Sequence, residues 1–251
     1  MSKINPGITQ RQAAILAAIV REYANSSQPI GSEELCDKYK FGFSSATIRN
    51  EMSALEEMGY IEQPHTSAGR VPTDKGFRYF VNELMRRFEL SLKEQRQLRE
   101  HLERLQEQNQ EIGRSIAKLL AQKSEQAAFA LLPEETSASG LANIFQNPDL
   151  DRQGMAEVAE FFEDIDEYAD KMLSKMLKET PEALIGKETQ LAPLKNYSLI
   201  VSRVNLPSGK QGVIGIIGPK AMRYDKNISL VEYVAKFLSG GALLLLIFLV
   251  R

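Results

Sequence analysis

The sequence is poor in the residues that most often form cross-links, metal sites and catalytic centres. Its 251 residues include one cysteine, two histidines and no tryptophan. The single cysteine, Cys36, excludes an intrachain disulfide framework and a Cys-rich zinc site. Long hydrophobic runs are also missing. The longest, residues 242–250, has nine residues, whereas a membrane-spanning helix needs about 20.

Neither sign of charge dominates the chain. There are 31 Lys and Arg residues and 33 Asp and Glu residues, for a formal net charge of −2. This balance excludes a protein that is basic throughout, although it allows a local basic patch. The first residues lack the apolar run of a signal peptide. We therefore expect a soluble, cytoplasmic protein with no membrane association.

The residue pattern gives catalysis little support. His65 lies in a polar loop and His101 in a long helical pattern, and neither belongs to a recognisable nucleophile or metal-ligand motif. Cys36 stands beside Leu35 in a short helical segment, where packing is the simpler interpretation. We expect no enzymatic activity, no catalytic residue, no metal and no cofactor.

The N-terminal part of the chain contains explicit helix start signals. Thr9 and Gln12 have the spacing of a capping box before a first helix. Ser32 is expected to cap a short second helix, and Ser44 or Ser45 a third, with a Gly-containing turn between them. Two helices joined by such a turn, after a packing helix, are typical of a helix-turn-helix motif.

The third expected helix is amphipathic. Ile48, Met52, Leu55 and Met58 recur at spacings of 4, 3 and 3. The opposite face carries the small or polar residues Ala46, Thr47, Arg49, Asn50 and Ser53. Small residues let a helix backbone approach the major groove of DNA, while Arg and Asn can pair with guanine and adenine edges. This face alone leaves an ordinary solvated helix surface open as the alternative.

A β-hairpin is expected directly after this helix. Residues 60–63 alternate like a strand, residues 64–70 form a small polar loop, and residues 71–73 form a second strand limited by proline. A hairpin in this position is a wing, and no acidic residue occurs from Pro64 to Thr73. A surface hairpin without a ligand is the alternative. The expected phosphate or minor-groove donors are His65, Thr66, Ser67, Arg70, Lys75 and Arg78.

The charge of this region is balanced. Residues 1–90 contain 11 Lys and Arg residues and 11 Asp and Glu residues. Affinity for DNA must therefore come from the placement of charges and from two copies acting together.

Residues 77–126 predict one long helix with a coiled-coil-like seam, because they lack proline and their apolar residues follow a 4-3 alternation. If continuous, residues 77–119 would span roughly 64 Å. Ser91 and Gln95 interrupt the seam, which leaves a bend open, and packing on its own chain is the alternative to pairing. The predicted dimerisation residues are Leu98, Leu102, Leu105, Asn109, Ile112, Ile116 and Leu119.

The distal half predicts strands over residues 197–206 and 212–218, joined by a turn, and then a helix around residues 228–238. The fold class is therefore α+β. We expect three parts: a winged helix-turn-helix domain over residues 1–88, a long helix over 89–126, and a distal domain over 127–251 with an apolar C-terminal tail.

Several ordered motifs carry a family resemblance. The stretch from Ser44 to Met52, with Gly59-Tyr60-Ile61 and the stretch from Pro64 to Arg78, closely resembles the HrcA family of bacterial heat-inducible transcription repressors. Pro29-Ile30-Gly31-Ser32 fits the same pattern. Residues 140–150, 185–188 and 212–219 resemble motifs of the later half of the family.

The resemblance implies a dimeric repressor with a winged-helix domain, a GAF-like domain and a dimerising insertion. It implies binding to an inverted-repeat operator upstream of chaperone genes, with a chaperonin as partner. By position, residues 44–53 would be the major-groove helix and residues 65–70 the wing. Only seven residues separate Leu132 from Gly140, where the family usually has a long stretch. We therefore expect a shortened member with a truncated GAF-like domain.

The functional prediction is a homodimeric, sequence-specific repressor of heat-shock genes that binds double-stranded DNA. Arg49 and Asn50 are the expected base contacts, while Ser44, Ser45 and Thr47 are expected to contact phosphate or base edges. Two alternatives stay open: a coiled-coil protein-interaction module and a ligand-sensing winged-helix regulator. A steep salt dependence and a preference for an inverted repeat would distinguish the repressor from the interaction module. A ligand that raises the melting temperature and changes the DNA affinity would favour the regulator.

Overall fold

The computed structural model describes residues 8–66, 68–85, 88–107, 112–133, 135–146, 152–168, 180–189 and 194–241. The chain forms two compact units, one of Met1–Arg86 with Lys220–Arg223 and one of Arg87–Pro219 with Tyr224–Arg251. Helices and antiparallel sheets occur together, which confirms the α+β class. Among the described residues, no helix has both the length and the apolar character needed to cross a membrane.

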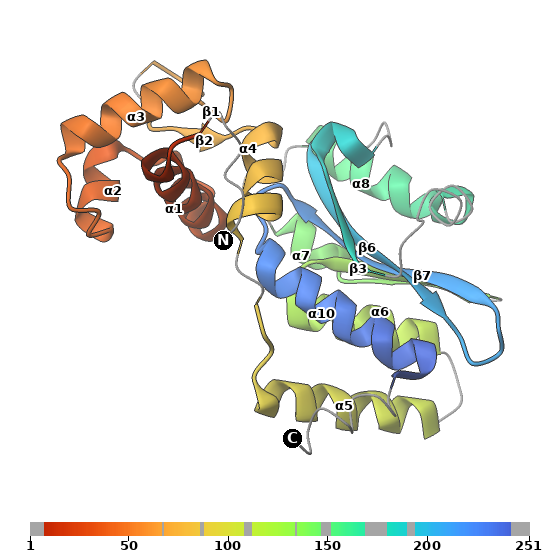
Figure 1. Ribbon diagram of the computed structural model, residues 1–251. Coiled ribbons are helices and arrows are strands. Elements are labelled where there is room, and N and C mark those ends of the chain that lie inside the picture. The colour runs from red at the N-terminus through yellow and green to blue at the C-terminus, as the bar shows by residue number, and fades with distance from the viewer. Residues whose placement is uncertain are drawn as a thin grey trace. The chain divides into compact units, whose positions relative to one another are not determined.

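The first unit consists of three packed helices, a hairpin and a final helical segment (Figure 1). Its elements are α1 (Gln10–Ser26), α2 (Ser32–Lys38), α3 (Ser45–Glu57), β1 (Ile61–Glu62), β2 (Val71–Pro72), α4 (Asp74–Tyr79) and the π-helical turn η1 (Phe80–Leu84). Helix α3 packs against both α1 and α2. Strands β1 and β2 pair in antiparallel fashion, with Ile61 opposite Pro72. The expected helix-turn-helix followed by a hairpin is confirmed.

The start signals of these helices are mostly as expected. Thr9 and Gln12 form the predicted capping box of α1, and Ser44 is the N-cap of α3. Gly42, with a φ of 80°, occupies the turn before α3, where a left-handed backbone suits glycine. The prediction that Ser32 caps α2 is wrong. Gly31 holds the cap position, and Ser32 is the first residue of the helix and is buried.

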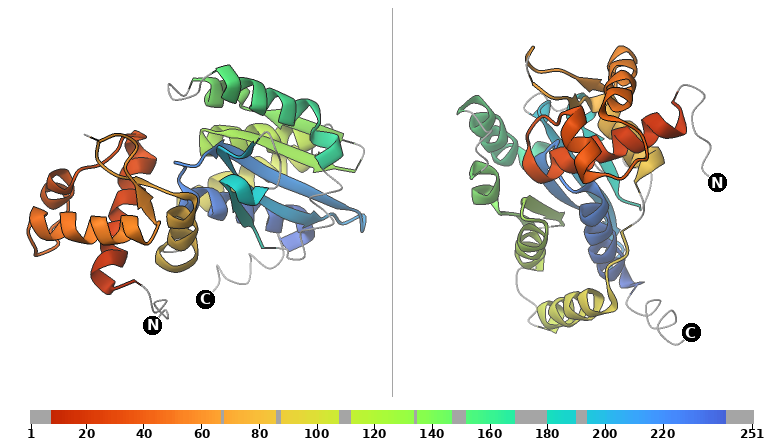
Figure 2. Two further views of the ribbon diagram at one scale, coloured as in Figure 1. Left: turned by 90° about the horizontal axis from the view of Figure 1, so that it is seen from above. Right: turned by 90° about the vertical axis from the view of Figure 1, so that its left-hand side faces the viewer.

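The second unit is a five-stranded antiparallel sheet with helices on both faces (Figures 1 and 2). The strand order is β4 (Glu135–Ser139), β3 (Ala127–Leu132), β7 (Gln211–Pro219), β6 (Tyr197–Asn205) and β5 (Glu182–Ile185). Strands β6 and β7 confirm the two predicted strands. The other elements are α5 (Leu92–Glu107), α6 (Ile112–Ser124), α7 (Leu141–Phe145), α8 (Arg152–Glu163), η2 (Gly186–Thr189), α10 (Tyr224–Lys236) and η4 (Phe237–Gly241).

The two faces of this sheet pack against different helices. Phe129, Val201 and Ile217 alternate onto one face and share a core cluster with Phe161 of α8. Gly215 lies across from Phe129, and a Cβ there would lie 2.5 Å from the phenylalanine ring, so glycine gives that ring its space. The opposite face packs against α6 and α10. Both faces of the sheet are therefore closed within the unit.

The prediction of one continuous helix over residues 77–126 is wrong. The first unit's final helical turn ends at Leu84, residues 88–91 are not helical, and α5 begins at Leu92. The backbone N–H of Ser91 donates to the Glu94 carboxylate at 2.9 Å, and the Glu94 N–H donates to the Ser91 hydroxyl at 3.3 Å. This reciprocal cap starts a new helix at the place where the seam is interrupted, as the open alternative of a bend allowed.

The predicted dimerisation residues lie mostly inside the second unit. Leu98 and Leu102 of α5 are 3% and 1% exposed, and Ile116 and Leu119 of α6 are 0% and 2% exposed. Helix α5 packs on α6, and α6 packs on β3 and β4. Leu105 and Ile112 are partly buried, and Asn109 lies outside the described residues. This burial agrees with the alternative of packing on the same chain, and pairing between chains stays a prediction.

The short segment between Leu132 and Gly140 completes the edge of the sheet. It contains β4, which pairs with β3 from Leu132 opposite Glu135 to Ala128 opposite Ser139. Strand β4 therefore follows β3 directly as the edge strand of the sheet, without a long insertion between them. The GAF-like assignment stays a prediction, and the apolar tail at residues 242–250 lies outside the described residues.

Glu135 of β4 caps the first turn of α6. Its two carboxylate oxygens accept hydrogen bonds from the backbone N–H groups of Gly113 and Arg114, at 2.9 and 2.7 Å. A Cβ at position 113 would lie 2.8 Å from this carboxyl carbon, so glycine permits the approach. A negative charge that accepts two orphan N–H groups at a helix start is stabilising.

We predict that Glu135→Ala lowers the free energy of unfolding of the second unit by about 1–2 kcal/mol, because two helix N–H groups lose their acceptor. Urea denaturation of the full chain measures this change. Glu163→Ala, which removes an exposed carboxylate from the same unit, should change the free energy by less than about 0.5 kcal/mol. Equal losses in both variants would contradict the capping role.

Candidate nucleic-acid interface

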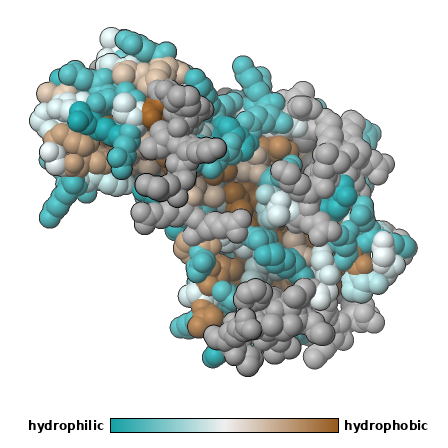
Figure 3. Space-filling view, viewed as in Figure 1, coloured by the Kyte–Doolittle hydropathy of each residue, from teal (hydrophilic) through white to brown (hydrophobic). Residues whose placement is uncertain are grey.

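Helix α3 has one buried and one exposed side. Ile48, Met52 and Leu55 are 0%, 5% and 0% exposed and face the other helices of the unit. Arg49 and Asn50 are exposed, as are Ala46 and Ser53, while Thr47 is partly buried. The polar face predicted from the sequence is therefore open to a partner. Figure 3 shows hydrophilic side chains spread over this unit, with moderately hydrophobic ones between them.

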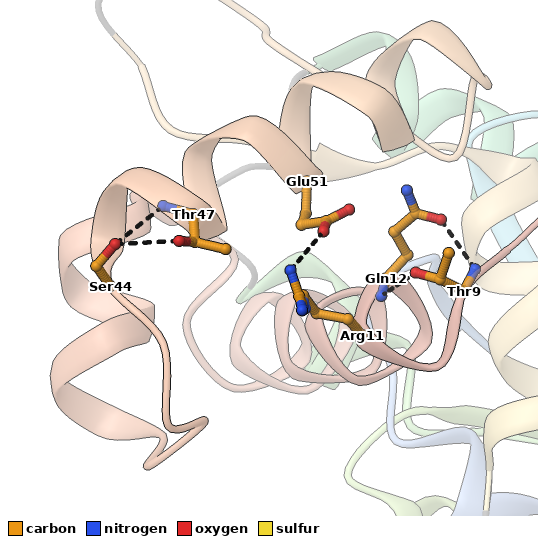
Figure 4. Close-up of polar contacts among 6 residues, drawn as sticks. All are labelled: Thr9, Arg11, Gln12, Ser44, Thr47 and Glu51. Atoms are coloured by element: carbon orange, nitrogen blue, oxygen red, sulfur yellow. Dashed lines mark hydrogen bonds and ion pairs between the residues drawn. The ribbon is translucent and has the colours of Figure 1, made fainter.

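The N-terminus of α3 is fixed by its own side chains. The Ser44 hydroxyl accepts a hydrogen bond from the Thr47 backbone N–H at 3.3 Å, and the two hydroxyl oxygens lie 3.1 Å apart (Figure 4). Ser44 is exposed and Ser45 is partly buried. The Ser44 hydroxyl can still reach solvent or a phosphate while it caps the helix, because a hydroxyl has more than one hydrogen-bonding site.

Helix α3 is also tied to α1. The Arg11 guanidinium lies 3.3 Å from the Glu51 carboxylate (Figure 4) and 5.2 Å from the centre of the Phe43 ring. Helix α2 is tied to α1 through Glu22, which accepts from Lys38 Nζ at 2.8 Å and from the Tyr39 hydroxyl at 2.9 Å. The hydrogen bond from Lys38 is the largest cause that lowers the pKa of the Glu22 carboxyl. These contacts hold α1, α2 and α3 in fixed positions relative to one another.

The expected base-contacting arginine has a carboxylate beside it. Arg49 Nη2 lies 3.7 Å from the Glu33 carboxylate, and the two side chains are 67% and 81% exposed. An ion pair that is this exposed contributes little to stability and exchanges easily for another partner. Arg49 is therefore available to a ligand.

Gln63 contacts the tip of the wing hairpin through its side chain. The Gln63 side-chain amide donates to the backbone carbonyls of Thr66 at 3.0 Å and Ala68 at 2.9 Å. His65 and Thr66 are exposed at the tip, and Ser67 lies outside the described residues. The Gln63 contacts fix the backbone beside the tip, where His65 and Thr66 are accessible to a ligand.

The remaining predicted donors are engaged within the unit. Lys75 is exposed, but its amine donates to the Met58 carbonyl at 2.7 Å and lies 4.3 Å from the centre of the Tyr60 ring. Arg78 is partly buried, and its guanidinium donates to Asn82 at 3.4 Å. Arg70 forms an ion pair with Glu56 at 2.8 Å and is 19% exposed. Of the predicted cations, Arg49 and Lys75 are exposed, whereas Arg70 and Arg78 are partly buried.

A hollow of about 400 Å³ lies beside α3 in this unit. The lining includes Gly31 and Glu33 at the start of α2, Arg49 of α3, and Gln63 and Arg70 of the hairpin. The structure thus brings the predicted helix and the predicted wing to one surface. Reasoning from the sequence missed Glu56 and Gln63. Glu56 lies four residues after Met52, at the edge of the apolar face, which is a weak signal that it faces the hairpin.

Three packed helices followed by a hairpin, with the polar side of the third helix exposed, define a winged helix-turn-helix DNA-binding domain. The family model described as "Winged helix-turn-helix transcription repressor, HrcA DNA-binding" matches residues 7–85. The model described as "HrcA protein C terminal domain" matches residues 73–228, which is more than half of the chain. The chain belongs to the HrcA family. The two matches confirm the resemblance found in the sequence. The HrcA family is a family of transcription repressors and not of enzymes.

Curated relatives agree with this family. The chain is 44% identical over 131 residues to "Heat-inducible transcription repressor HrcA" of Pelotomaculum thermopropionicum, a match that covers 52% of this chain and 38% of that protein. It is 46% identical over 124 residues to the protein of the same name from Desulforamulus reducens, covering 49% of this chain and 36% of that protein. The matches thus span less than two fifths of these relatives.

A solved structure supports the fold. A crystal structure of a hypothetical protein has a TM-score of 0.69 to this chain, with 21% sequence identity, and the match covers 93% of this chain and 97% of the other. At this identity the likeness concerns the fold alone.

We predict that Ser44→Ala lowers the free energy of unfolding of the first unit by about 1 kcal/mol, because the Thr47 N–H loses its cap. Ser45→Ala is the matched control, since Ser45 is already inside the helix and alanine is a good helix former. Thermal unfolding followed by circular dichroism measures both. A Ser45→Ala loss as large as that of Ser44→Ala would contradict the assignment of the cap.

Proposed function

We propose that this chain is a repressor of heat-shock genes that binds an inverted-repeat operator as a homodimer. The observation that carries the proposal is the exposed polar face of α3, where Arg49 and Asn50 face away from the core while Ile48, Met52 and Leu55 are buried. The names of the relatives, heat-inducible transcription repressors, support the choice of target genes.

We assign roles to the side chains by their position. Arg49 pairs with a guanine edge or a phosphate, and Asn50 with an adenine edge, because both project from the exposed face of α3. Ser44, Ser45 and Thr47 lie at the start of α3, and Ser53 lies further along the same face, where each can reach phosphate or base edges. At the wing, His65, Thr66 and Ser67 are the proposed backbone or minor-groove contacts.

Two copies acting together support useful affinity better than one. The first 90 residues carry 11 positive and 11 negative side chains, so bulk charge adds little, whereas two linked domains gain from a high effective concentration. A two-fold symmetric protein also matches the symmetry of an inverted repeat. A chaperonin partner, a GAF-like regulatory role and cytoplasmic localisation belong to the same proposal.

Two competing functions have less support. A coiled-coil interaction module needs an apolar seam on the surface, yet Leu98, Leu102, Ile116 and Leu119 are buried within the second unit. A ligand-sensing regulator needs a pocket in the distal domain, and the only argument for one is the GAF-like resemblance. DNA titrations separate the interaction module from the proposed repressor, whereas a ligand that raises the melting temperature and changes the DNA affinity would favour the ligand-sensing regulator.

Selection of bound sites from random DNA by the full chain tests the proposal. A repressor of this kind should enrich an inverted repeat with half-sites one helical turn, or a multiple of it, apart. Binding to the selected duplex should weaken steeply with salt and exceed binding to a scrambled duplex. Enrichment of no motif, or equal affinity for both duplexes, would contradict sequence-specific repression.

We predict that Arg49→Ala weakens binding to the selected duplex by about 1–3 kcal/mol and relaxes specificity at one position of each half-site. Gel-shift titration of wild-type and variant chains measures the change. Arg104→Ala removes the same charge from a residue of α5 that is 72% exposed and serves as the matched control. Normal operator binding by Arg49→Ala would remove this residue from the interface.

A further inference from the structure

Arg70, at the base of the wing, is joined to helix α3. Its Nε donates to Glu56 Oε2 at 2.9 Å, and its Nη2 lies 2.8 Å from the same oxygen. The two side chains are 19% and 34% exposed, far less than the Arg49 and Glu33 pair. When a partly buried guanidinium directs two N–H groups at one carboxylate, the contact fixes the orientation of the guanidinium as well as pairing its charge.

The backbone at the base of the wing is fixed as well. Arg70 and Ile30, which lies before α2, exchange two backbone hydrogen bonds of 2.9 and 3.1 Å. A Cβ at Gly69 would lie 2.3 Å from the Ile30 carbonyl carbon, so only glycine allows the two segments to come this close. The hairpin therefore meets the start of α2 through its backbone and α3 through the side chain of Arg70.

Helix-to-wing spacing matters if this unit reads DNA. A helix in the major groove and a wing in the neighbouring minor groove must stand on either side of one sugar-phosphate backbone. The hollow beside α3 is lined by Arg49 on the helix and by Gln63 and Arg70 on the hairpin. A wing that swings relative to α3 changes the width of this hollow, so one of the two groove contacts is lost.

We propose that Arg70 is a positioning residue that holds the wing against α3 through its ion pair with Glu56 (the Arg70–Glu56 pin), and that it makes no direct contact with DNA. This inference rests on the proposed DNA-binding function and names the residues that set its geometry. Glu56 is the second half of the pin. Gln63, through its two hydrogen bonds to wing carbonyls, shapes the tip beyond it.

Glu56→Gln separates this role from simple electrostatics. The substitution removes a negative charge close to the interface, so charge alone predicts tighter binding to every DNA sequence. The pin predicts the opposite for the operator, because a neutral amide holds the guanidinium weakly and the wing loses its direction. Arg70→Lys keeps the charge but loses the planar fork of donors, and the pin predicts that it behaves like Glu56→Gln.

The test uses the full chain with Glu56→Gln, Arg70→Lys and the matched control Glu57→Gln, which removes the same charge from an exposed neighbour on α3. The probes are the inverted-repeat duplex selected by the wild type and a scrambled duplex of equal length. We expect Glu56→Gln and Arg70→Lys to lose about tenfold in affinity for the inverted repeat and none for the scrambled duplex. Glu57→Gln should lose no affinity for either.

Hydrogen exchange of the free chains gives a reading that needs no DNA. The amides of residues 68–71 should exchange faster in Glu56→Gln and Arg70→Lys than in the wild type or Glu57→Gln, while the core amides of α1 and α3 stay protected and show that the unit is folded. Unchanged exchange at the wing, or tighter operator binding by Glu56→Gln, would overturn the pin. If the wild type prefers no duplex while the wing amides respond, the DNA-binding proposal fails and the pin remains.

Discussion

Burial of the apolar side of α3 is the constraint on which the remainder of the first unit depends. Ile48, Met52 and Leu55 are almost fully removed from solvent, and each such side chain contributes about 1.5–3 kcal/mol when buried. Rotating the helix by half a turn would expose all three and place Asn50 and Ser53 in the core without partners, at a cost of several kcal/mol. The same packing that stabilises the domain therefore presents Arg49 and Asn50 outward.

Charge in this unit is arranged in local pairs. Arg11, Arg49 and Arg70 each lie within 4 Å of a carboxylate, and these pairs differ in exposure. The exposed Arg49 pair can exchange its partner, whereas the more buried Arg70 pair joins two elements. Such a neutral surface offers weak attraction to DNA in general, so recognition depends on how accurately α3 and the wing are held. Because the unit has little net charge, its contacts between helices and between α3 and the wing matter more for DNA recognition.

The second unit shows why a periodic helical pattern does not define its partner. The apolar seam through α5 and α6 has the spacing of a coiled coil, yet α6 uses it to cover the sheet and α5 uses it to pack on α6. The Ser91 and Glu94 cap separates α5 from the helical segment that ends at Leu84. Once the chain can fold back, burying the seam against its own sheet avoids the entropy cost of association with a second chain.

The sequence by itself determined the features that depend on neighbouring residues: the Thr9 capping box, the Ser44 cap, the amphipathic third helix and the hairpin after it. The cap at Ser91 was also legible as a Ser-x-x-Glu spacing, although the longer seam obscured it. Only the tertiary structure decided what covers the seam and which arginine is available to a ligand. Arg70 and Glu56 are 14 residues apart, and local spacing carries no information about such a contact. Periodicity shows that a face is apolar or charged, whereas the long-range packing of the chain selects what that face meets.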